Sequence, residues 1–227
     1  MRQFLIVDAD DTLWENNIYF ERAFDDFCDF LSHSRLDRNQ VRAVLDQIER
    51  VNNQAHGYGS RNFARNMVEC YRRLAERNIE PADIERILAL ADAIMAQPVE
   101  LLPGVPETLE ALAGRHELTL FTKGHPEEQK LKIDRSGLGR FFAHTAIVKE
   151  KDAPSYRELV RSRGMDPART WMIGNSPKSD VNPALEAGLG AVFVPHDRTW
   201  HLELQEIPAS APRLLVIERF ADLRLYF

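Results

Sequence analysis

The sequence predicts an α/β protein in which strands of a parallel β-sheet alternate with helices and a helical unit is inserted after the first strand. Short apolar runs recur along the chain, and helical patterns of roughly 10–15 residues separate the later runs. Between the first and second runs the chain shows only helical patterns. The 227 residues, 44% of them hydrophobic, are enough to bury a sizeable core.

The apolar runs define the expected sheet and the helices that cover it. Strands are expected at 4–7, 118–121, 145–148, 170–173, 191–194 and 214–217. Helices are expected between the later strands, at 105–113, 127–136, 155–163 and 177–187. Because strands that alternate with such helices form βα units, we expect a parallel sheet with helices on both faces.

The inserted segment predicts a helical domain. Its expected helices are 18–31, 38–51, 61–77 and 81–96, and its least helix-like stretch is 52–61. In the first helix, Phe20, Phe24 and Phe27 recur at helical spacing and so form one apolar face. We therefore expect a core domain built from residues 1–14 and 101–227, with a helical domain over 15–100.

Composition and charge exclude several classes of protein. The formal net charge is -6, which argues against nucleic-acid or membrane-surface binding, because both usually need an excess of basic residues. The apolar runs are far shorter than the ~20 residues of a membrane span. Two cysteines cannot form a disulfide framework, so we expect a cytoplasmic protein. No pattern indicates an oligomeric state.

Three carboxylates follow the first expected strand, at Asp8, Asp10 and Asp11. In open α/β sheets, ligands bind beyond the carboxyl ends of the strands. One interpretation is an acidic turn that caps a helix. The other is a pair with separate roles: one carboxylate stays ionised as a nucleophile beside a metal or a lysine, and a second, driven by like charge to hold a proton, acts as a general acid.

The next strand ends carry groups that suit an anion. Thr122, Lys123 and Gly124 combine a hydroxyl, a cation and a flexible backbone, which together can cradle a phosphate. A threonine at this place is more often a simple helix cap. Lys149 and Lys151 follow the third strand, where a lysine could neutralise both a carboxylate and a phosphate or simply be solvated.

The end of the fourth strand carries Asn175 and Asp180, whose oxygens suit a hard divalent cation. The alternative is a well-capped helix start, with Ser176 as the cap and Pro177 at the first helical position. Taken together, the strand ends supply a carboxylate nucleophile, a second acid, a hydroxyl, a lysine and a Mg²⁺ site. This set suits phosphoryl transfer to water.

The same residues give the sequence a resemblance to the haloacid dehalogenase-like superfamily. Asp8-Ala9-Asp10-Asp11-Thr12 looks like its first motif, Asp-x-Asp-x-Thr, and Thr122 matches its second. Lys151, three residues before Pro154, fits the third motif, Lys-x-x-Pro, better than Lys149 does. The segment from Gly174 to Asp180 is similar to the fourth, Gly-Asp-x-x-x-x-Asp. The resemblance covers essentially the whole core.

The resemblance implies a Rossmann-like core with a helical cap that closes on substrate. It makes Asp8 the nucleophile and Asp10 the general acid/base, and it assigns the transferring phosphoryl group to Thr122 and Lys151. It places Mg²⁺ on an Asp8 oxygen, the Asp10 backbone carbonyl and the oxygens of Asn175 and Asp180. Two residues depart from the usual pattern: Asn175 replaces an aspartate, which removes one negative charge, and Lys123 stands where many members have asparagine.

The activity that the resemblance implies is that of a Mg²⁺-dependent phosphatase, which hydrolyses a small phosphorylated metabolite through an aspartyl-phosphate. Three alternatives stay open. A phosphomutase would use the same carboxylates. A 2-haloacid dehalogenase needs the aspartate nucleophile but no metal and no acid two residues later. A binding or regulatory protein would retain the fold without turnover.

Overall fold

A computed structural model shows a six-stranded sheet in the order β3-β2-β1-β4-β5-β6, in which every neighbouring pair is parallel. The structure describes residues 1–208 and 210–227. The strands are β1 (Phe4–Val7), β2 (Glu117–Lys123), β3 (His144–Val148), β4 (Thr170–Gly174), β5 (Gly190–Phe193) and β6 (Leu214–Val216). The predicted α/β class with a parallel sheet is confirmed, and the expected strands shift only slightly at their ends.

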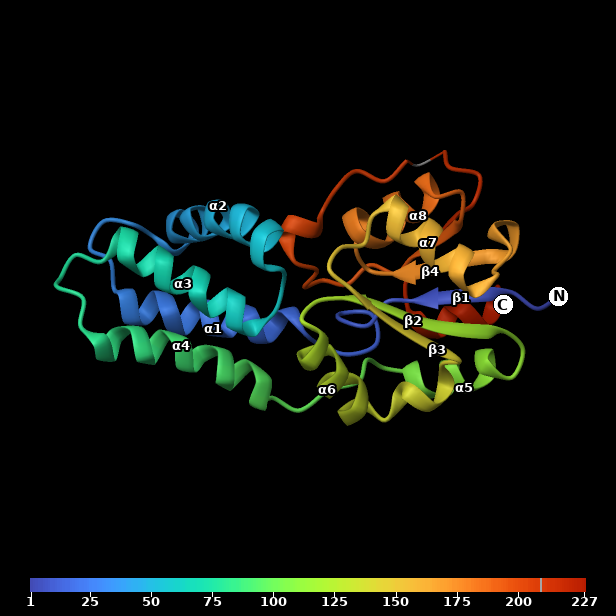
Figure 1. Ribbon diagram of the computed structural model, residues 1–227, viewed down its shortest axis with the longest axis horizontal. Coiled ribbons are helices and arrows are strands. Elements are labelled where there is room, and N and C mark those ends of the chain that lie inside the picture. The colour runs from blue at the N-terminus through green and yellow to red at the C-terminus, as the bar shows by residue number, and fades with distance from the viewer. Residues whose placement is uncertain (209) are drawn as a thin grey trace. The chain divides into compact units, whose positions relative to one another are not determined.

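Helices cover both faces of the sheet (Figure 1). One face packs on α5 (Val105–Ala113) and α6 (Pro126–Ser136), and the other on α7 (Ala153–Arg163) and α8 (Asn182–Glu186). The central strand shows why its sequence is continuously apolar. Leu5 and Val7 pack in the apolar cluster on the side of α5 and α6, and Ile6 packs in the cluster on the side of α7 and α8. Successive side chains are therefore buried on opposite faces.

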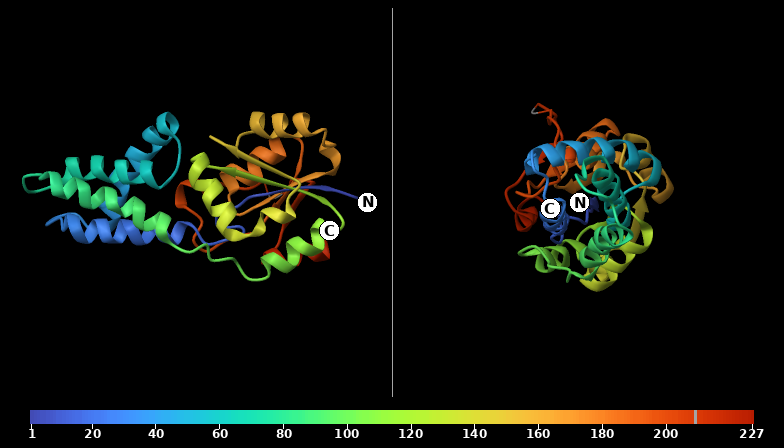
Figure 2. Two further views of the ribbon diagram at one scale, coloured as in Figure 1. Left: turned by 60° about the horizontal axis from the view of Figure 1, so that its bottom comes forward. Right: turned by 90° about the vertical axis from the view of Figure 1, so that its left-hand side faces the viewer.

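The chain divides into two compact units, Met1–Asn17 with Val99–Phe227, and Ile18–Pro98. The helices of the inserted segment are α1 (Asn17–Leu31), α2 (Arg38–His56), α3 (Ser60–Leu74) and α4 (Pro81–Ala96). They lie side by side within their unit around a separate apolar core that includes Phe27, Leu45, Met67 and Ile87 (Figure 2). That the two units act as a core domain and a cap domain remains a prediction.

The two stretches of chain that lead to the helical unit pair with each other inside the first unit. Trp14 and Leu101 form an antiparallel bridge. The Glu15 amide donates to the Glu100 carbonyl at 2.9 Å, and the Leu102 amide donates to the Leu13 carbonyl at the same distance. This pairing fixes the chain just beyond the first acidic loop.

Helix α2 extends further than the sequence predicted. The stretch 52–61 was expected to be the least helix-like, yet α2 continues to His56. Asparagine disfavours helices because its side chain competes for backbone hydrogen bonds. Here those side chains are used elsewhere: the Asn52 amide donates to the Asn66 side chain at 2.9 Å, and Asn53 accepts from the Asn62 side chain at 2.9 Å.

The prediction of a single helix over 177–187 is wrong. The chain makes a π-helical turn at Pro177–Val181 and then the short helix α8. Pro183 is one cause, because it has no amide hydrogen to donate to the preceding turn. The amide of Val181 instead donates to the Ser176 carbonyl at 3.1 Å, five residues back. Such turns concentrate at functional sites, and this one carries Asp180.

Over residues 1–208 and 210–227, no helix is both long enough and apolar enough to cross a bilayer.

Candidate active site

Asp8 lies directly after β1 at the carboxyl end of the sheet, and its side chain is buried. One carboxylate oxygen, Oδ1, pairs with the Lys151 ammonium. The other, Oδ2, lies 2.9 Å from the Thr12 hydroxyl, which can donate to it. These contacts hold the carboxylate in one orientation from two sides.

Lys151 joins Asp8 to a second carboxylate. It follows β3, and its side chain is only 1% exposed. Its Nζ lies 2.8 Å from Oδ1 of Asp180 as well as contacting Asp8. Burial alone would lower the pKa of the Lys151 ammonium, but the negative charges of Asp180 and Asp8 outweigh burial and raise it. Lys149, by contrast, is exposed, so the third-motif assignment to Lys151 agrees with the geometry.

Asp180 reaches this site because its π-helical turn folds back against the end of β4. The Ser176 amide donates to its Oδ2 at 2.9 Å. A Cβ on Gly174 would lie 2.2 Å from that same oxygen, so only glycine leaves room for the carboxylate. Burial and the charge of Asp8 raise the pKa of the Asp180 carboxyl despite the opposing effect of Lys151. The site therefore holds more negative charge than one lysine neutralises.

Asn175 completes the cluster of oxygens. Its Oδ1 lies 3.1 Å from the Thr12 hydroxyl, and its Nδ2 donates to Oγ1 of Thr199 at 2.9 Å. Carboxylate and amide oxygens are the donors that Mg²⁺ prefers. Together with the surplus negative charge, the oxygens of Asp8, Asp180 and Asn175 fit a hard divalent cation.

Asp10 belongs to a separate network. Both of its carboxylate oxygens lie 2.6 Å from the Lys132 ammonium, Gln129 Nε2 donates to Oδ2 at 2.7 Å, and Trp14 Nε1 donates to Oδ1 at 2.8 Å. Burial by itself would raise the pKa of Asp10, but the positive charge of Lys132 and these hydrogen bonds lower it. The expectation that like charge drives the second carboxylate to hold a proton is therefore wrong for Asp10.

Gly124 makes this network possible. Its backbone has a φ of 147°, and a Cβ there would lie 2.8 Å from Gln129 Nε2. That amide nitrogen also donates to the Lys123 carbonyl at 2.9 Å, which aims the Gln129 side chain at Asp10. A glycine expected to cradle a phosphate thus also gives room to a side chain that holds Asp10.

Thr122 and Lys123 end β2 but point to different partners. Thr122 is buried, and its hydroxyl lies 3.5 Å from the Lys123 carbonyl. The Lys123 ammonium lies 2.7 Å from Glu203 and 2.8 Å from the Ser179 hydroxyl. The structure therefore brings Asp8, Lys151, Asn175 and Asp180 together and places Lys123 in a neighbouring cluster.

Glu203 is the centre of that neighbouring cluster. Its buried carboxylate accepts from the Ser176 hydroxyl at 2.7 Å, from the Ser179 hydroxyl and from Lys123. Burial would raise the pKa of Glu203, but Lys123 and the two hydroxyls lower it. Sequence reasoning missed both Glu203 and Lys132, because neither lies in a motif and only the fold brings them to the strand ends.

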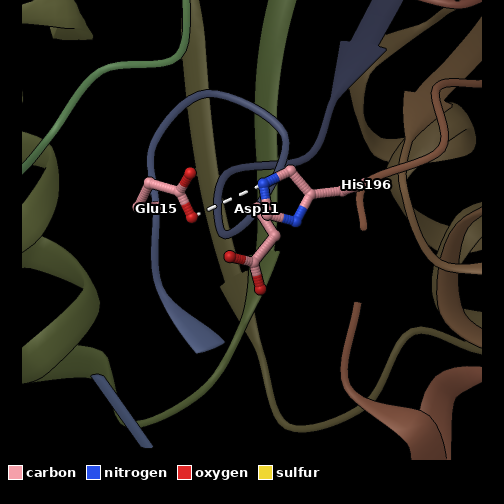
Figure 3. A group of neighbouring side chains, drawn as sticks. All are labelled: Asp11, Glu15 and His196. Atoms are coloured by element: carbon pink, nitrogen blue, oxygen red, sulfur yellow. Dashed lines mark ion pairs between the residues drawn. The ribbon is translucent and has the colours of Figure 1, made fainter. Parts of the chain in front are cut away.

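A third polar cluster consists of Asp11, Glu15 and His196 (Figure 3). Burial is the main cause that raises the pKa of Asp11 to about 7, and its φ is 59°. His196 Nδ1 accepts from the Arg198 amide at 3.3 Å, so its Nε2 carries the hydrogen that faces Glu15 Oε2 at 3.5 Å. Because imidazole binds metals through an unprotonated nitrogen, this arrangement favours a contact between the imidazole and the Glu15 carboxylate over a metal centre.

Known proteins that match this chain belong to one family of hydrolases. The family model for haloacid dehalogenase-like hydrolases matches residues 4–188. A crystal structure of a haloacid dehalogenase-like family hydrolase from Xanthomonas campestris is 32% identical, covers 99% of this chain and 94% of that one, and superposes with a TM-score of 0.85. An L-2-haloacid dehalogenase from Xanthobacter autotrophicus, 16% identical over 100% of this chain and 98% of its own with a TM-score of 0.67, shares the fold.

Curated relatives match over a shorter span. A phosphoserine phosphatase from Thermus thermophilus is 31% identical over 152 residues, and the pyrimidine 5'-nucleotidase YjjG from Escherichia coli is 27% identical over 127 residues. These alignments cover 63% and 53% of this chain, and 57% and 55% of those relatives, so the chain spans just over half their length. With the family model matching most of its length, the chain belongs to the haloacid dehalogenase-like hydrolases.

Proposed function

We propose that this hydrolase is a Mg²⁺-dependent phosphatase that transfers the phosphoryl group of a small phosphorylated metabolite to Asp8 and then to water, with Asp10 as general acid/base. The observation that carries the proposal is the buried Asp8 carboxylate, fixed by Lys151 and Thr12, with a second carboxylate two residues further along a fixed loop. That pair suits a displacement in which one carboxylate attacks and another moves protons.

In the proposed first step, an Asp8 oxygen attacks phosphorus while the bond to the leaving oxygen breaks, and Asp10 gives that oxygen a proton. In the second step Asp10 takes a proton from water, whose oxygen attacks phosphorus, and the Asp8 carboxylate is restored with release of phosphate. Lys151 stabilises negative charge in both steps because its ammonium already lies beside the Asp8 carboxylate.

Asp10 is ionised at rest, since Lys132 lowers its pKa. This form suits the second step, where a base is needed. For the first step Asp10 must take up a proton, and a protonated carboxyl binds an ammonium less strongly than a carboxylate does. The contact with Lys132 therefore has to loosen before Asp10 can act as an acid.

The cation would be held by Asp8, the backbone carbonyl of Asp10, Asn175 and Asp180, whose oxygens fit a hard ion. When bound, Mg²⁺ supplies positive charge for the phosphoryl oxygens. We assign the remaining phosphate contacts to the Thr122 hydroxyl and the backbone at Gly124. Lys123 would first have to leave Glu203, so we do not assign its ammonium to the phosphate.

The relatives support the substrate class without naming a substrate. The names of the curated relatives describe phosphatases of a pyrimidine nucleotide, phosphoserine and glyceraldehyde 3-phosphate. A small phosphorylated metabolite is what these compounds share. Dehalogenase chemistry does not use an acid at the position of Asp10. The hydrogen bonds that fix the Asp10 carboxylate therefore favour the phosphatase proposal. We further propose that the helical unit serves as a cap that selects the substrate.

The test is phosphate release from a panel of small phosphoesters, with Mg²⁺ and with EDTA. We expect Mg²⁺-dependent release that falls by about 10³-fold or more in Asp8→Asn, as loss of a nucleophile typically does. Asp134→Asn, on the exposed face of α6, is the matched control and should keep full activity. Unchanged turnover in Asp8→Asn would refute the proposal. Halide release from 2-haloacids or an isomerised phosphoester, without free phosphate, would favour an alternative activity.

A further inference from the structure

The geometry points to Thr199 as a positioning residue that orients the Asn175 carboxamide, so that its oxygen faces the Asp8 site and its nitrogen faces away. The consequence for cation binding rests on the proposed function, whereas the orientation itself does not. Thr199 lies in the segment after β5, outside every motif that the sequence displays.

A carboxamide can bind a hard cation only through its oxygen, and its two ends exchange places when the group flips by 180°. Asn175 has a neighbour at each end. Its Oδ1 lies 3.1 Å from the Thr12 hydroxyl, and its Nδ2 lies 2.9 Å from the Thr199 hydroxyl. One of these neighbours must decide which end faces the site.

Thr12 cannot decide the orientation. Its hydroxyl also lies 2.9 Å from Asp8 Oδ2, and it has only one hydrogen to donate. If that hydrogen goes to the Asp8 carboxylate, the Thr12 oxygen can accept a hydrogen bond from an amide nitrogen of Asn175. If the hydrogen instead points at Asn175, it can be donated to the amide oxygen. Both orientations of Asn175 are compatible with Thr12.

Thr199 can decide it. Its hydroxyl donates to the His196 carbonyl at 3.0 Å, so only its lone pairs remain for Asn175. The end of Asn175 that faces Thr199 must therefore be the donor, Nδ2, and the oxygen is left on the side of Asp8 and Thr12. Thr199 itself is held in place, because its neighbour Arg198 accepts from the Asn17 side chain through its carbonyl at 3.0 Å.

This chain of hydrogen bonds also accounts for an asparagine in the fourth motif. An aspartate at 175 would place an acceptor oxygen against the Thr199 oxygen. The hydroxyl could satisfy it only by giving up the His196 carbonyl. Asn175 and Thr199 are thus matched to each other, and the amide keeps a cation-binding oxygen on the site while supplying a donor behind it.

The experiment compares Thr199→Val, which keeps the shape but loses the hydroxyl, with Thr199→Ser, which keeps the hydroxyl. Thr170→Val is the matched control, because the Thr170 hydroxyl donates to the Asp166 carbonyl at 2.7 Å at the opposite end of β4. Two readouts are taken on the full-length protein without substrate: the side-chain amide signals of Asn175 in ¹H–¹⁵N NMR spectra, and the dissociation constant of Mg²⁺ by calorimetry.

We expect Thr199→Val to shift the Asn175 amide signals and to weaken Mg²⁺ binding about 10-fold, as losses of residues that orient metal ligands commonly do. Thr199→Ser and Thr170→Val should match the wild type. Unchanged amide signals and an unchanged dissociation constant in Thr199→Val would overturn the inference. Absence of Mg²⁺ binding by the wild type would instead contradict the proposed function, and the amide signals alone would then decide the role of Thr199.

Discussion

The ammonium of Lys132 lies 2.6 Å from both carboxylate oxygens of Asp10. This pair separates the two carboxylates of the first motif: Asp8 shares its charge with Lys151, whereas Asp10 shares its own with a lysine from α6. Each of these two carboxylates therefore has a lysine as a counter-charge, although Asp8 shares Lys151 with Asp180.

Removing Lys132 should change how activity depends on pH. Lys132 lowers the pKa of Asp10, so Lys132→Met should raise it. A general acid is active when protonated, and its activity falls as pH rises through its pKa. The alkaline fall in kcat/KM should therefore move to higher pH in Lys132→Met. Lys130→Met, an exposed position on the same helix, is the control, and an identical profile in both variants would contradict the role of Lys132.

Gly174→Ala should damage the site through sterics alone. The new Cβ would lie 2.2 Å from Asp180 Oδ2, so the carboxylate or the strand must move. We expect a loss of roughly 1–3 kcal/mol in the free energy of unfolding, together with loss of phosphatase activity. The nearest atom to a Cβ on Gly114 lies 3.9 Å away, so Gly114→Ala should be tolerated. Urea unfolding of the two variants makes the comparison, and equal stability would count against the close approach.

Asp11 should reduce stability as pH rises. Its pKa is raised to about 7 in the folded protein, against 3.8 for an ordinary aspartate. Between those values the folded state binds a proton that the unfolded state has lost, so stability falls with rising pH. Asp11→Asn should remove this fall and gain roughly 2–4 kcal/mol at pH 8 relative to wild type. Asparagine also tolerates the positive φ. The measurement is urea unfolding of the wild type and Asp11→Asn at pH 5 and pH 8, with EDTA. If the assignment is wrong, the free energy of unfolding will change with pH by the same amount in both proteins.

The contribution of Glu203 to stability should depend on pH in the opposite sense to that of Asp11. Its pKa lies below that of an unfolded glutamate, so its stabilisation is present above about pH 4.5 and is lost as pH falls through the folded value. Glu203→Gln leaves Lys123 with a weaker set of partners and should cost roughly 2–4 kcal/mol at neutral pH. Glu206→Gln, at an exposed position nearby, should have no measurable effect. Thermal unfolding at pH 7 distinguishes the two, and equal melting temperatures would disprove a stabilising role.

The fold could be predicted from the sequence because its signals are local. Each strand of the sheet is a short apolar run, and β1 matches its predicted bounds since both of its faces are buried. The predicted helices were wrong where tertiary contacts determine the local backbone conformation. Asn52 and Asn53 remain helical because partners from α3 occupy their side chains. Pro177–Val181 forms a π-helical turn that periodicity does not reveal.

The candidate site divides in the same way. Asp8, Lys151, Asn175 and Asp180 could be predicted because parallel strands bring their carboxyl ends to one edge. The partners of Asp10 could not, since Lys132 and Gln129 face it only once α6 has packed on the sheet. Thr199 lies in an irregular segment after β5 and Glu203 ends a single 3₁₀ turn, so no longer periodic pattern indicates which side chains turn inward.

The claim that Asp8 carries the phosphoryl group is tested most directly by trapping it there. The protein is mixed with a ³²P-labelled phosphoester and Mg²⁺, quenched in acid within one turnover, digested and sequenced. We predict hydroxylamine-labile label on the peptide that contains Asp8 and no label in Asp8→Asn. Rapid release of labelled phosphate with no label on that peptide at any quench time, or label on a different residue, would contradict the account.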